Sequence, residues 1–262
     1  MKVVILCGGK GTRLGEVTGN LIPKPMAMVG NEPILVHIMR SYARRGHREF
    51  ILCAGHLSWA IKSYFLDYHA RQADVTIHTG KRGDVTFHDA HELDDWKVTI
   101  AETGPDSGTA GRLRKVAKYI EPGESFMLTY GDGVSDVDLA GLEAFHQAHG
   151  KLVTMTGVVP PGRFGELVLD GDTVTDWAEK PTVTDRYING GFMVMQREFI
   201  DRFVVDKDDD VMLEREPLAE ATTAGELMLF RHGGFWQCMD TARDWALLNE
   251  LWESGNAPWA EG

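Results

Sequence analysis

The chain opens with the stretch that decides its fold, Lys2-Val3-Val4-Ile5-Leu6-Cys7-Gly8-Gly9-Lys10-Gly11-Thr12-Arg13. The unbroken apolar run to Leu6 is typical of a central parallel strand, and the glycines after it are typical of a loop that lets a ligand approach the backbone. Arg13 adds a forked cation at the end of this loop. A purely structural turn would use the same glycines, so the loop alone leaves both interpretations open. It lacks the third glycine of G-x-G-x-x-G and the Lys-Ser or Lys-Thr of a Walker A loop.

The segments that follow alternate between predicted strands and helices. We expect helices at 33–44, 58–70 (capped by Ser58), 112–119 and 139–149, and strands at 49–53, 74–78, 98–102 and 125–130. This βαβ series predicts an α/β protein, a Rossmann-like three-layer α/β/α arrangement with a doubly wound sheet.

The pattern changes after Gly150 to shorter strands separated by glycine and proline turns. We expect strands at 152–158, 166–169, 174–177 and 227–231, and helices at 197–203, 212–224 and 241–252. These short strands predict that the second half of the chain forms a mixed or antiparallel sheet with a small β-rich part. Residues 1–262 are treated as one domain, and 80–96 as an insertion that could serve oligomer contacts.

Composition and charge narrow the classes of function. The 262 residues are 43% hydrophobic and 25% charged, which is typical of a globular protein. A formal net charge of -12 argues against a broad nucleic-acid surface. The N-terminus carries no signal-peptide pattern, and no segment reaches the roughly 18 apolar residues of a membrane span, so we expect a cytoplasmic protein without a membrane partner. Three cysteines without metal-type spacing predict free thiols.

Two aspartates and a lysine are candidates for chemistry. Asp132 follows an apolar strand in Tyr130-Gly131-Asp132-Gly133, so it should lie at the carboxyl edge of the sheet, where its oxygens suit magnesium on a nucleotide phosphate. The alternative is an ordinary turn aspartate. Asp240 precedes a predicted helix and is either a second metal ligand or the N-cap of that helix. Lys24 lies between two prolines that restrict its backbone, and by itself is equally consistent with a surface turn.

These motifs, taken together, resemble the nucleotide-sugar pyrophosphorylase family, and within it the cytidylyltransferase subgroup, from Lys2 to Trp259. The matching stretches are the glycine loop, Pro23-Lys24-Pro25-Met26, Thr103-Gly104, Thr109-Ala110-Gly111-Arg112, Thr129-Tyr130-Gly131-Asp132-Gly133-Val134, Pro161-Gly162-Arg163-Phe164-Gly165, Glu179-Lys180-Pro181, Asn189-Gly190-Gly191-Phe192 and Gly234-Phe235-Trp236-Gln237. The resemblance implies the nucleotide-diphospho-sugar transferase fold. It also implies an Mg2+-dependent reaction of CTP with glucose 1-phosphate in a homo-oligomer such as a hexamer.

The resemblance also implies roles for individual residues. Residues 1–150 would form the nucleotide-binding half and 151–262 the sugar-phosphate half. The nucleotide would contact Leu6, Cys7, Gly8, Gly9, Lys10, Gly11, Thr12, Arg13, Lys24, Thr109, Arg112, Gly131 and Asp132. The sugar phosphate would contact Gly133, Gly165, Glu179, Lys180, Asn189, Gly190 and Trp236. The catalytic residues would be Arg13, Lys24, Asp132 and Lys180, and the metal ligands Asp132 and Asp240.

The sequence departs from the family pattern at four positions, which bear on the choice of substrates. Cys7 and Ala110 replace an alanine and a glycine, Ile22 replaces a second lysine near the triphosphate, and Cys238 replaces a proline beside Asp240. Other nucleotide and sugar or cyclitol phosphate pairs stay open, as does a catalytically silent sensor that binds one of them.

Three further polar or aromatic features receive simpler explanations. His88 and His91 lack a third ligand and are expected to be solvated. Residues 208–210, all aspartate, are expected at a solvated helix entrance. Trp236 could form the floor of a sugar site or fill the core.

Overall fold

The computed structural model describes residues 1–88, 95–159, 166–170, 173–178 and 187–260. Its centre is a seven-stranded sheet in the order β14-β10-β13-β8-β1-β4-β7. The strands of this sheet are β1 (Lys2–Leu6), β4 (Glu49–Ala54), β7 (Lys97–Glu102), β8 (Ser125–Tyr130), β10 (Val153–Val158), β13 (Ile188–Gln196) and β14 (Leu227–His232). Strand β13 runs antiparallel to both neighbours, β8 and β10, whereas the other neighbouring pairs are parallel. The predicted mixed sheet is therefore confirmed.

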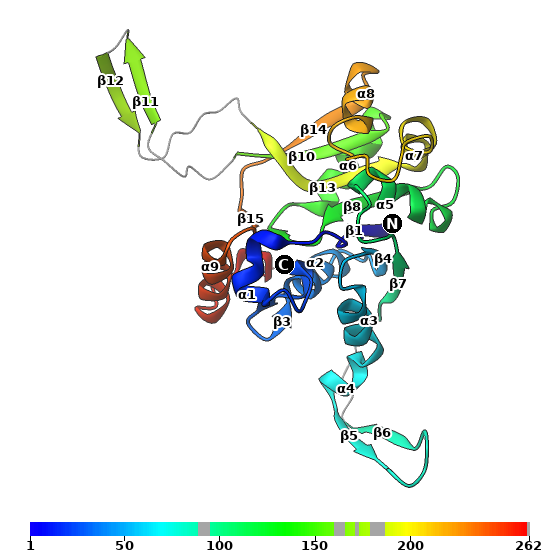
Figure 1. The fold of residues 1–262 in the computed structure, drawn as a ribbon. Helices are drawn as coiled ribbons and strands as arrows, with labels where there is room; N and C mark the ends of the chain where they lie inside the picture. The colour runs from blue at the N-terminus through cyan, green and yellow to red at the C-terminus, as the bar shows by residue number, and fades with distance from the viewer. Residues whose placement is uncertain (89–94, 160–165, 171–172, 179–186, 261–262) are drawn as a thin grey trace.

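Helices cover both faces of this sheet (Figure 1). The helices are α1 (Gly15–Thr18), α2 (Ile34–Ala43), α3 (Ser58–Leu66), α4 (Tyr68–Gln72), α5 (Thr109–Val116), α6 (Leu139–His149), α7 (Arg197–Phe203), α8 (Pro217–Thr223) and α9 (Ala242–Glu253). Side chains alternate along β1, so that Val3 and Ile5 pack with α2, α6 and α9, while Val4 and Leu6 pack with α5, α7 and α8. This alternation produces the expected three-layer α/β/α arrangement. Among the described residues, no helix has the length and apolarity needed to cross a membrane.

Short elements complete the chain. They are the 3₁₀ turns η1 (Thr12–Leu14), η2 (Lys24–Met26), η3 (Ala117–Tyr119) and η4 (Pro258–Ala260), and the strand pairs β2 (Met28–Val29) with β3 (Glu32–Pro33), β5 (Asp74–Ile77) with β6 (Val85–His88), β11 (Glu166–Asp170) with β12 (Thr173–Ala178), and β9 (Gly133–Ser135) with β15 (Trp236–Cys238).

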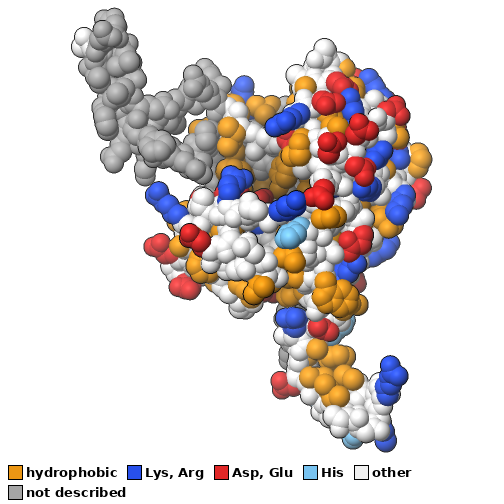
Figure 2. All heavy atoms as spheres, viewed as in Figure 1, with side chains coloured by type: hydrophobic (Ala, Val, Ile, Leu, Met, Phe, Trp, Pro, Cys, Tyr) orange, Lys and Arg blue, Asp and Glu red, His pale blue; other side chains and the backbone are white. Residues whose placement is uncertain are grey.

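The structure corrects several local expectations. Strand β5 does not join the main sheet: it forms a projecting hairpin with β6, and the apolar side chains of Ile77 and Phe87 on it are 61% and 43% exposed (Figures 1 and 2). The predicted helix 58–70 is broken at Asp67, and Ser58 does not cap it, because Ser58 donates to Glu102 while Leu57 occupies the N-cap position. Strand β13, which lies inside the sheet between β10 and β8, has no counterpart in the sequence-based prediction.

Candidate active site

The glycine loop that follows β1 is shaped by a close approach of Arg112. The guanidinium of Arg112 donates to the carbonyl oxygen of Gly8 at 2.9 Å. A Cβ atom on Gly8 would lie 1.9 Å from Nη1 of Arg112, so any larger residue here would displace the guanidinium. The carbonyl of Gly8 also accepts from the backbone N–H of His56 at 3.1 Å. The loop is thus held from two sides, and its position is fixed before any ligand arrives.

Arg112 itself is almost fully buried, with 4% of its surface exposed. Besides Gly8, it donates to Oγ1 of Thr103 at 2.7 Å and to the carbonyl of Gly104 at 2.8 Å. Burial lowers the pKa of the guanidinium from its very high usual value, and an arginine remains charged at any physiological pH. Its donors are directed at loop oxygens, so Arg112 holds the loops at Gly8 and Gly104 in place.

A first cavity of about 400 Å³ opens beside this loop. It contains most residues that the sequence assigned to the nucleotide, and its lining is Leu6, Cys7, Gly8, Gly9, Gly11, Arg13, Lys24, Pro25, Ser107, Thr109, Arg112, Tyr130, Gly131, Asp132, Met212 and Glu214. Lys10 and Thr12, also assigned to the nucleotide, are not part of this lining. Lys10 instead pairs with Asp106 at 2.8 Å on the surface. Burial raises the pKa of the Cys7 thiol to about 12, so this thiol stays protonated.

A second cavity of about 290 Å³ adjoins the first. Its lining is Arg13, Thr129, Tyr130, Asp132, Gly133, Asn189, Gly190, Trp236, Cys238 and Asp240. Trp236, which could have been a core residue, is half-buried, lines this cavity and donates from Nε1 to the carbonyl of Gly190 at 2.7 Å. The two cavities share Arg13, Tyr130 and Asp132. Two ligands bound in them would therefore meet at these three residues.

Lys24, Asp132 and Asp240 form the charged centre at this junction. The Lys24 ammonium lies 2.6 Å from Oδ2 of Asp132 and 2.5 Å from Oδ1 of Asp240, while Arg13 lies 3.1 Å from the other oxygen of Asp240. Burial acts to lower the pKa of Lys24, but the carboxylates outweigh burial and the pKa is raised. For Asp240, burial acts to raise the pKa, and Lys24 and Arg13 outweigh it so that the pKa is lowered. Both groups therefore remain ionised at neutral pH.

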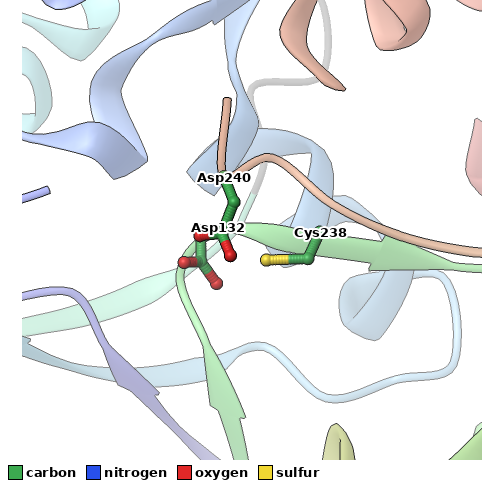
Figure 3. Close-up of side chains that lie close together, drawn as sticks. All are labelled: Asp132, Cys238 and Asp240. Carbon is green, nitrogen blue, oxygen red and sulfur yellow. The ribbon is translucent and has the colours of Figure 1, made fainter. Parts of the chain in front are cut away.

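The two aspartates are distant in sequence and are joined by the short β9–β15 pair. Strand β9 directly follows Asp132, β15 ends two residues before Asp240, and Cys238 is paired with Gly133. The backbone N–H of Met239 donates to the carbonyl of Asp132 at 2.8 Å. Asp132, Cys238 and Asp240 consequently present ligand atoms within 4.8 Å of one another (Figure 3). Carboxylate oxygens that already hold an ammonium also fit a divalent cation.

The structure excludes one of the two roles that the sequence left open for Asp240, that of the helix N-cap. The N-cap of α9 is Thr241, whose hydroxyl accepts from the backbone N–H of Asp244, while the Asp244 carboxylate accepts from the backbone N–H of Thr241. This capping box satisfies the start of the helix without Asp240. The Asp240 side chain is thereby left free to face Lys24 and Arg13.

Residues 208–214 pack against the start of α5 and supply Met212 and Glu214 to the wall of the first cavity, which the sequence did not predict. The carbonyls of Asp209 and Val211 accept from the backbone N–H groups of Gly108 and Ala110 at the start of α5, at 2.8 and 3.1 Å. The 208–210 run is not a helix entrance, since α8 begins only at Pro217, and the Asp209 carboxylate pairs with Arg114 and Lys115 of α5.

The same segment brings Glu214 into the cavity wall. Glu214 accepts from Thr109 at 2.8 Å and from the hydroxyl of Tyr130, which in turn accepts from Nδ2 of Asn189 at 3.1 Å. Burial, followed by the charge of Glu214, raises the pKa of the Tyr130 phenol, so this phenol remains a donor. This chain of hydrogen bonds links the two cavities. No local sequence signal separates Glu214 from the helix expected at 212–224.

Four of the expected positions, Gly165, Glu179, Lys180 and His91, are outside the described residues. His88 is exposed on the projecting hairpin. Ile22, which stands where the family has a second lysine, packs against the core. Within the described residues, Lys24 and Arg13 are the cations that contact the carboxylates of Asp132 and Asp240. The cysteines are free thiols, as expected.

Comparisons with known proteins agree with this geometry. The family model described as Nucleotidyl transferase matches residues 2–237. The chain is 46% identical over 259 residues to glucose-1-phosphate cytidylyltransferase from Salmonella typhi, an alignment that covers 99% of this chain and 98% of that one. It is 43% identical over 259 residues to a probable glucose-1-phosphate cytidylyltransferase from Bacillus subtilis, covering 99% of each chain.

Solved structures share the fold at low sequence identity. A putative glucose-1-phosphate thymidylyltransferase from Bacillus anthracis superposes with a TM-score of 0.69 at 16% identity, over 96% of this chain and 94% of that one. A UDP-glucose pyrophosphorylase superposes with a TM-score of 0.68 at 14% identity, over 97% of this chain and 98% of that one. At such identities the likeness concerns the fold alone.

Proposed function

The chain belongs to the nucleotidyl transferase family, and we propose that it makes CDP-glucose and pyrophosphate from CTP and α-D-glucose 1-phosphate. The relatives that match over nearly the whole chain carry the name of this activity. The observation that supports it most directly is the junction of two cavities at Arg13, Tyr130 and Asp132. A transferase for two substrates needs both of them bound with their reacting atoms adjacent.

The chemistry follows from the charges at this junction. An oxygen of the sugar phosphate attacks the α-phosphorus of CTP, and pyrophosphate leaves on the opposite side. The attacking phosphate is already ionised, so the protein needs no strong base. Its main task is to hold two anions together against their repulsion. Lys24 and Arg13 supply positive charge where the cavities meet, and Lys180 is proposed to bind the sugar phosphate.

The carboxylates of Asp132 and Asp240 are the proposed magnesium ligands. They converge on one point, where they hold the ammonium of Lys24, and hard oxygen ligands of this kind suit Mg2+. Bound there, the ion would supply charge neutralisation for the triphosphate. Lys24 contacts both carboxylates, so a cation held there would take the place of its ammonium, which would then be free to bind a phosphate oxygen.

The remaining assignments are proposals of the same kind. Leu6, Cys7, Gly8, Gly9, Gly11, Thr109, Arg112 and Gly131 are proposed for the nucleotide side, and Gly133, Gly165, Glu179, Asn189, Gly190 and Trp236 for the sugar-phosphate side. Residues 1–150 and 151–262 are proposed to act as the corresponding halves of one domain. We further propose a cytoplasmic homo-oligomer, in which the projecting β5–β6 hairpin provides contacts.

A matrix of nucleoside triphosphates against sugar and cyclitol 1-phosphates, read by pyrophosphate release, tests the proposed function. CTP with glucose 1-phosphate should give the highest kcat/KM. A higher value for another pair would retain the reaction and replace the substrates. Calorimetric binding of CTP without pyrophosphate release from any pair would refute the transferase and identify a sensor.

A further inference from the structure

Cys238 places a thiol beside the two carboxylates that form the centre of the site. Its sulfur and one oxygen each of Asp132 and Asp240 lie within 4.8 Å of one another (Figure 3). All three side chains line the second cavity, so an ion in solution can reach them. The β9–β15 pairing fixes the backbone of Cys238 opposite Gly133. The set therefore combines one soft ligand with two hard ligands on a defined framework.

The three ligand atoms are close enough for one tetrahedral cation to draw them together. Zinc binds thiolate sulfur at about 2.3 Å and carboxylate oxygen at about 2.0–2.2 Å, so two ligands at the tetrahedral angle of one ion lie roughly 3.4–3.6 Å apart. The three atoms lie within 4.8 Å of one another, and side-chain movements of about 1 Å would close them around one ion. The Lys24 ammonium, within 2.6 Å of both carboxylates, already occupies the position of a cation between them.

We propose that Asp132, Cys238 and Asp240 form a three-ligand site for a thiophilic divalent cation such as Zn2+ or Cd2+. The cation replaces the thiol proton of Cys238, which passes to solvent, and takes the place of the Lys24 ammonium. Magnesium gains little from sulfur, whereas zinc and cadmium gain a strong ligand, so the thiol shifts the preference of the site toward soft ions.

A soft ion held in this way should inhibit the enzyme. It occupies both carboxylates and adds a third protein ligand, which withdraws them from the metal carried by the triphosphate. This consequence rests on the proposed function, but the binding of the ion does not. The site would make the transferase sensitive to free zinc in a manner that depends on one side chain.

Titration of the nucleotide-free protein with Cd2+, followed by the thiolate-to-metal absorption in the near ultraviolet, tests the site. Wild type and the buried-thiol control Cys53→Ser should show the absorption, and Cys238→Ser should lose it. In Cys238→Ser the affinity for Cd2+ should fall about tenfold or more, while the affinity for Mn2+, a hard ion, should change less than about twofold. Retained Mn2+ binding also shows that the variant is folded.

The proposal is overturned if wild type gives no such absorption, if Cys238→Ser keeps it, or if the two proteins bind Cd2+ equally. Inhibition is measured separately by pyrophosphate release with added Zn2+, where Cys238→Ser should need a higher zinc concentration for half inhibition. If no substrate pair releases pyrophosphate, the proposed function fails while the cadmium titration still decides the metal site.

Discussion

Replacing Gly8 by alanine should destabilise the protein far more than the same change at Gly9, one residue further along the loop. A Cβ at position 8 would lie 1.9 Å from Nη1 of Arg112 and 3.0 Å from the carbonyl oxygen of Cys53, whereas a Cβ at position 9 meets nothing within 4 Å. Van der Waals contact needs about 3.5 Å, so the guanidinium must move by about 1.5 Å. Arg112 is 4% exposed, and its guanidinium is held by hydrogen bonds to Gly8, Thr103 and Gly104 that such a movement would disturb.

The magnitude follows from the hydrogen bonds that this movement breaks. The contact from Arg112 to the Gly8 carbonyl is 2.9 Å, and a shift of this size takes it out of hydrogen-bond range. A hydrogen bond to a charged group contributes about 1.5–3 kcal/mol, and overpacking costs about 1–3 kcal/mol. We expect Gly8→Ala to lower the free energy of unfolding by about 2–4 kcal/mol and Gly9→Ala by less than about 0.5 kcal/mol.

Urea unfolding of both variants measures this difference, and a double-mutant cycle with Arg112→Ala tests its cause. In the Arg112→Ala background the clash is absent, so the loss of stability caused by Gly8→Ala should shrink by about 1 kcal/mol or more. Independent mutations add to within about 0.3–0.5 kcal/mol, so a difference of this size would show that the two residues interact. Equal destabilisation by Gly8→Ala and Gly9→Ala, or an unchanged cost of Gly8→Ala without Arg112, would refute the argument that Arg112 dictates glycine here.

Three further predictions concern the site and the core. Asp240→Asn should lower the rate of pyrophosphate release by about 100-fold or more, because one of the two carboxylates proposed to hold the metal is lost. The circular dichroism spectrum should be unchanged. An unaltered rate would exclude Asp240 from the proposed metal site. Trp236→Phe loses the 2.7 Å hydrogen bond to Gly190, so the KM for glucose 1-phosphate should rise roughly 3- to 10-fold with the KM for CTP unaltered, and an equal rise in both would point to a structural role. Burial, followed by the charge of His149, lowers the pKa of His146 to about 4, whereas an unfolded histidine titrates near about 6.5. The unfolded state therefore binds the proton at a higher pH than the folded state does, and the free energy of unfolding falls as the pH drops from about 6.5 to about 4. In urea unfolding at several pH values, His146→Asn should reduce this dependence of stability on pH. The same dependence in both proteins would contradict the prediction.

Local periodicity was sufficient for much of the fold. The apolar run at Val3 to Leu6 forms β1, and the helical patterns at 33–44 and 139–149 form α2 and α6 almost to their ends. The sequence did not reveal β13, because its register and burial arise from β8 and β10 on either side and its first half contains two adjacent glycines. Strand β5 was recognised as a strand but not as part of a hairpin outside the sheet, since strand propensity does not specify the partner.

The candidate site shows the same division. The glycine loop, Asp132 and Asp240 carry recognisable local patterns, and the structure brings them together. Glu214 carries no such pattern, because its place in the cavity depends on backbone hydrogen bonds from residues 209 and 211 to the start of α5. Cys238 was noted only as an unusual neighbour of Asp240, and its proximity to Asp132 depends on the pairing of β9 with β15.

The sequence by itself determined the α/β class, the glycine-rich loop after β1 and the residue types available for nucleotidyl transfer, because strand and helix periods and glycine turns are properties of adjacent residues. Only the tertiary structure decided that Lys24 lies between Asp132 and Asp240, that Arg112 holds the Gly8 loop, and that two cavities share lining residues. These relations join residues about a hundred positions or more apart. They are fixed by sheet order and close packing, which no local pattern encodes.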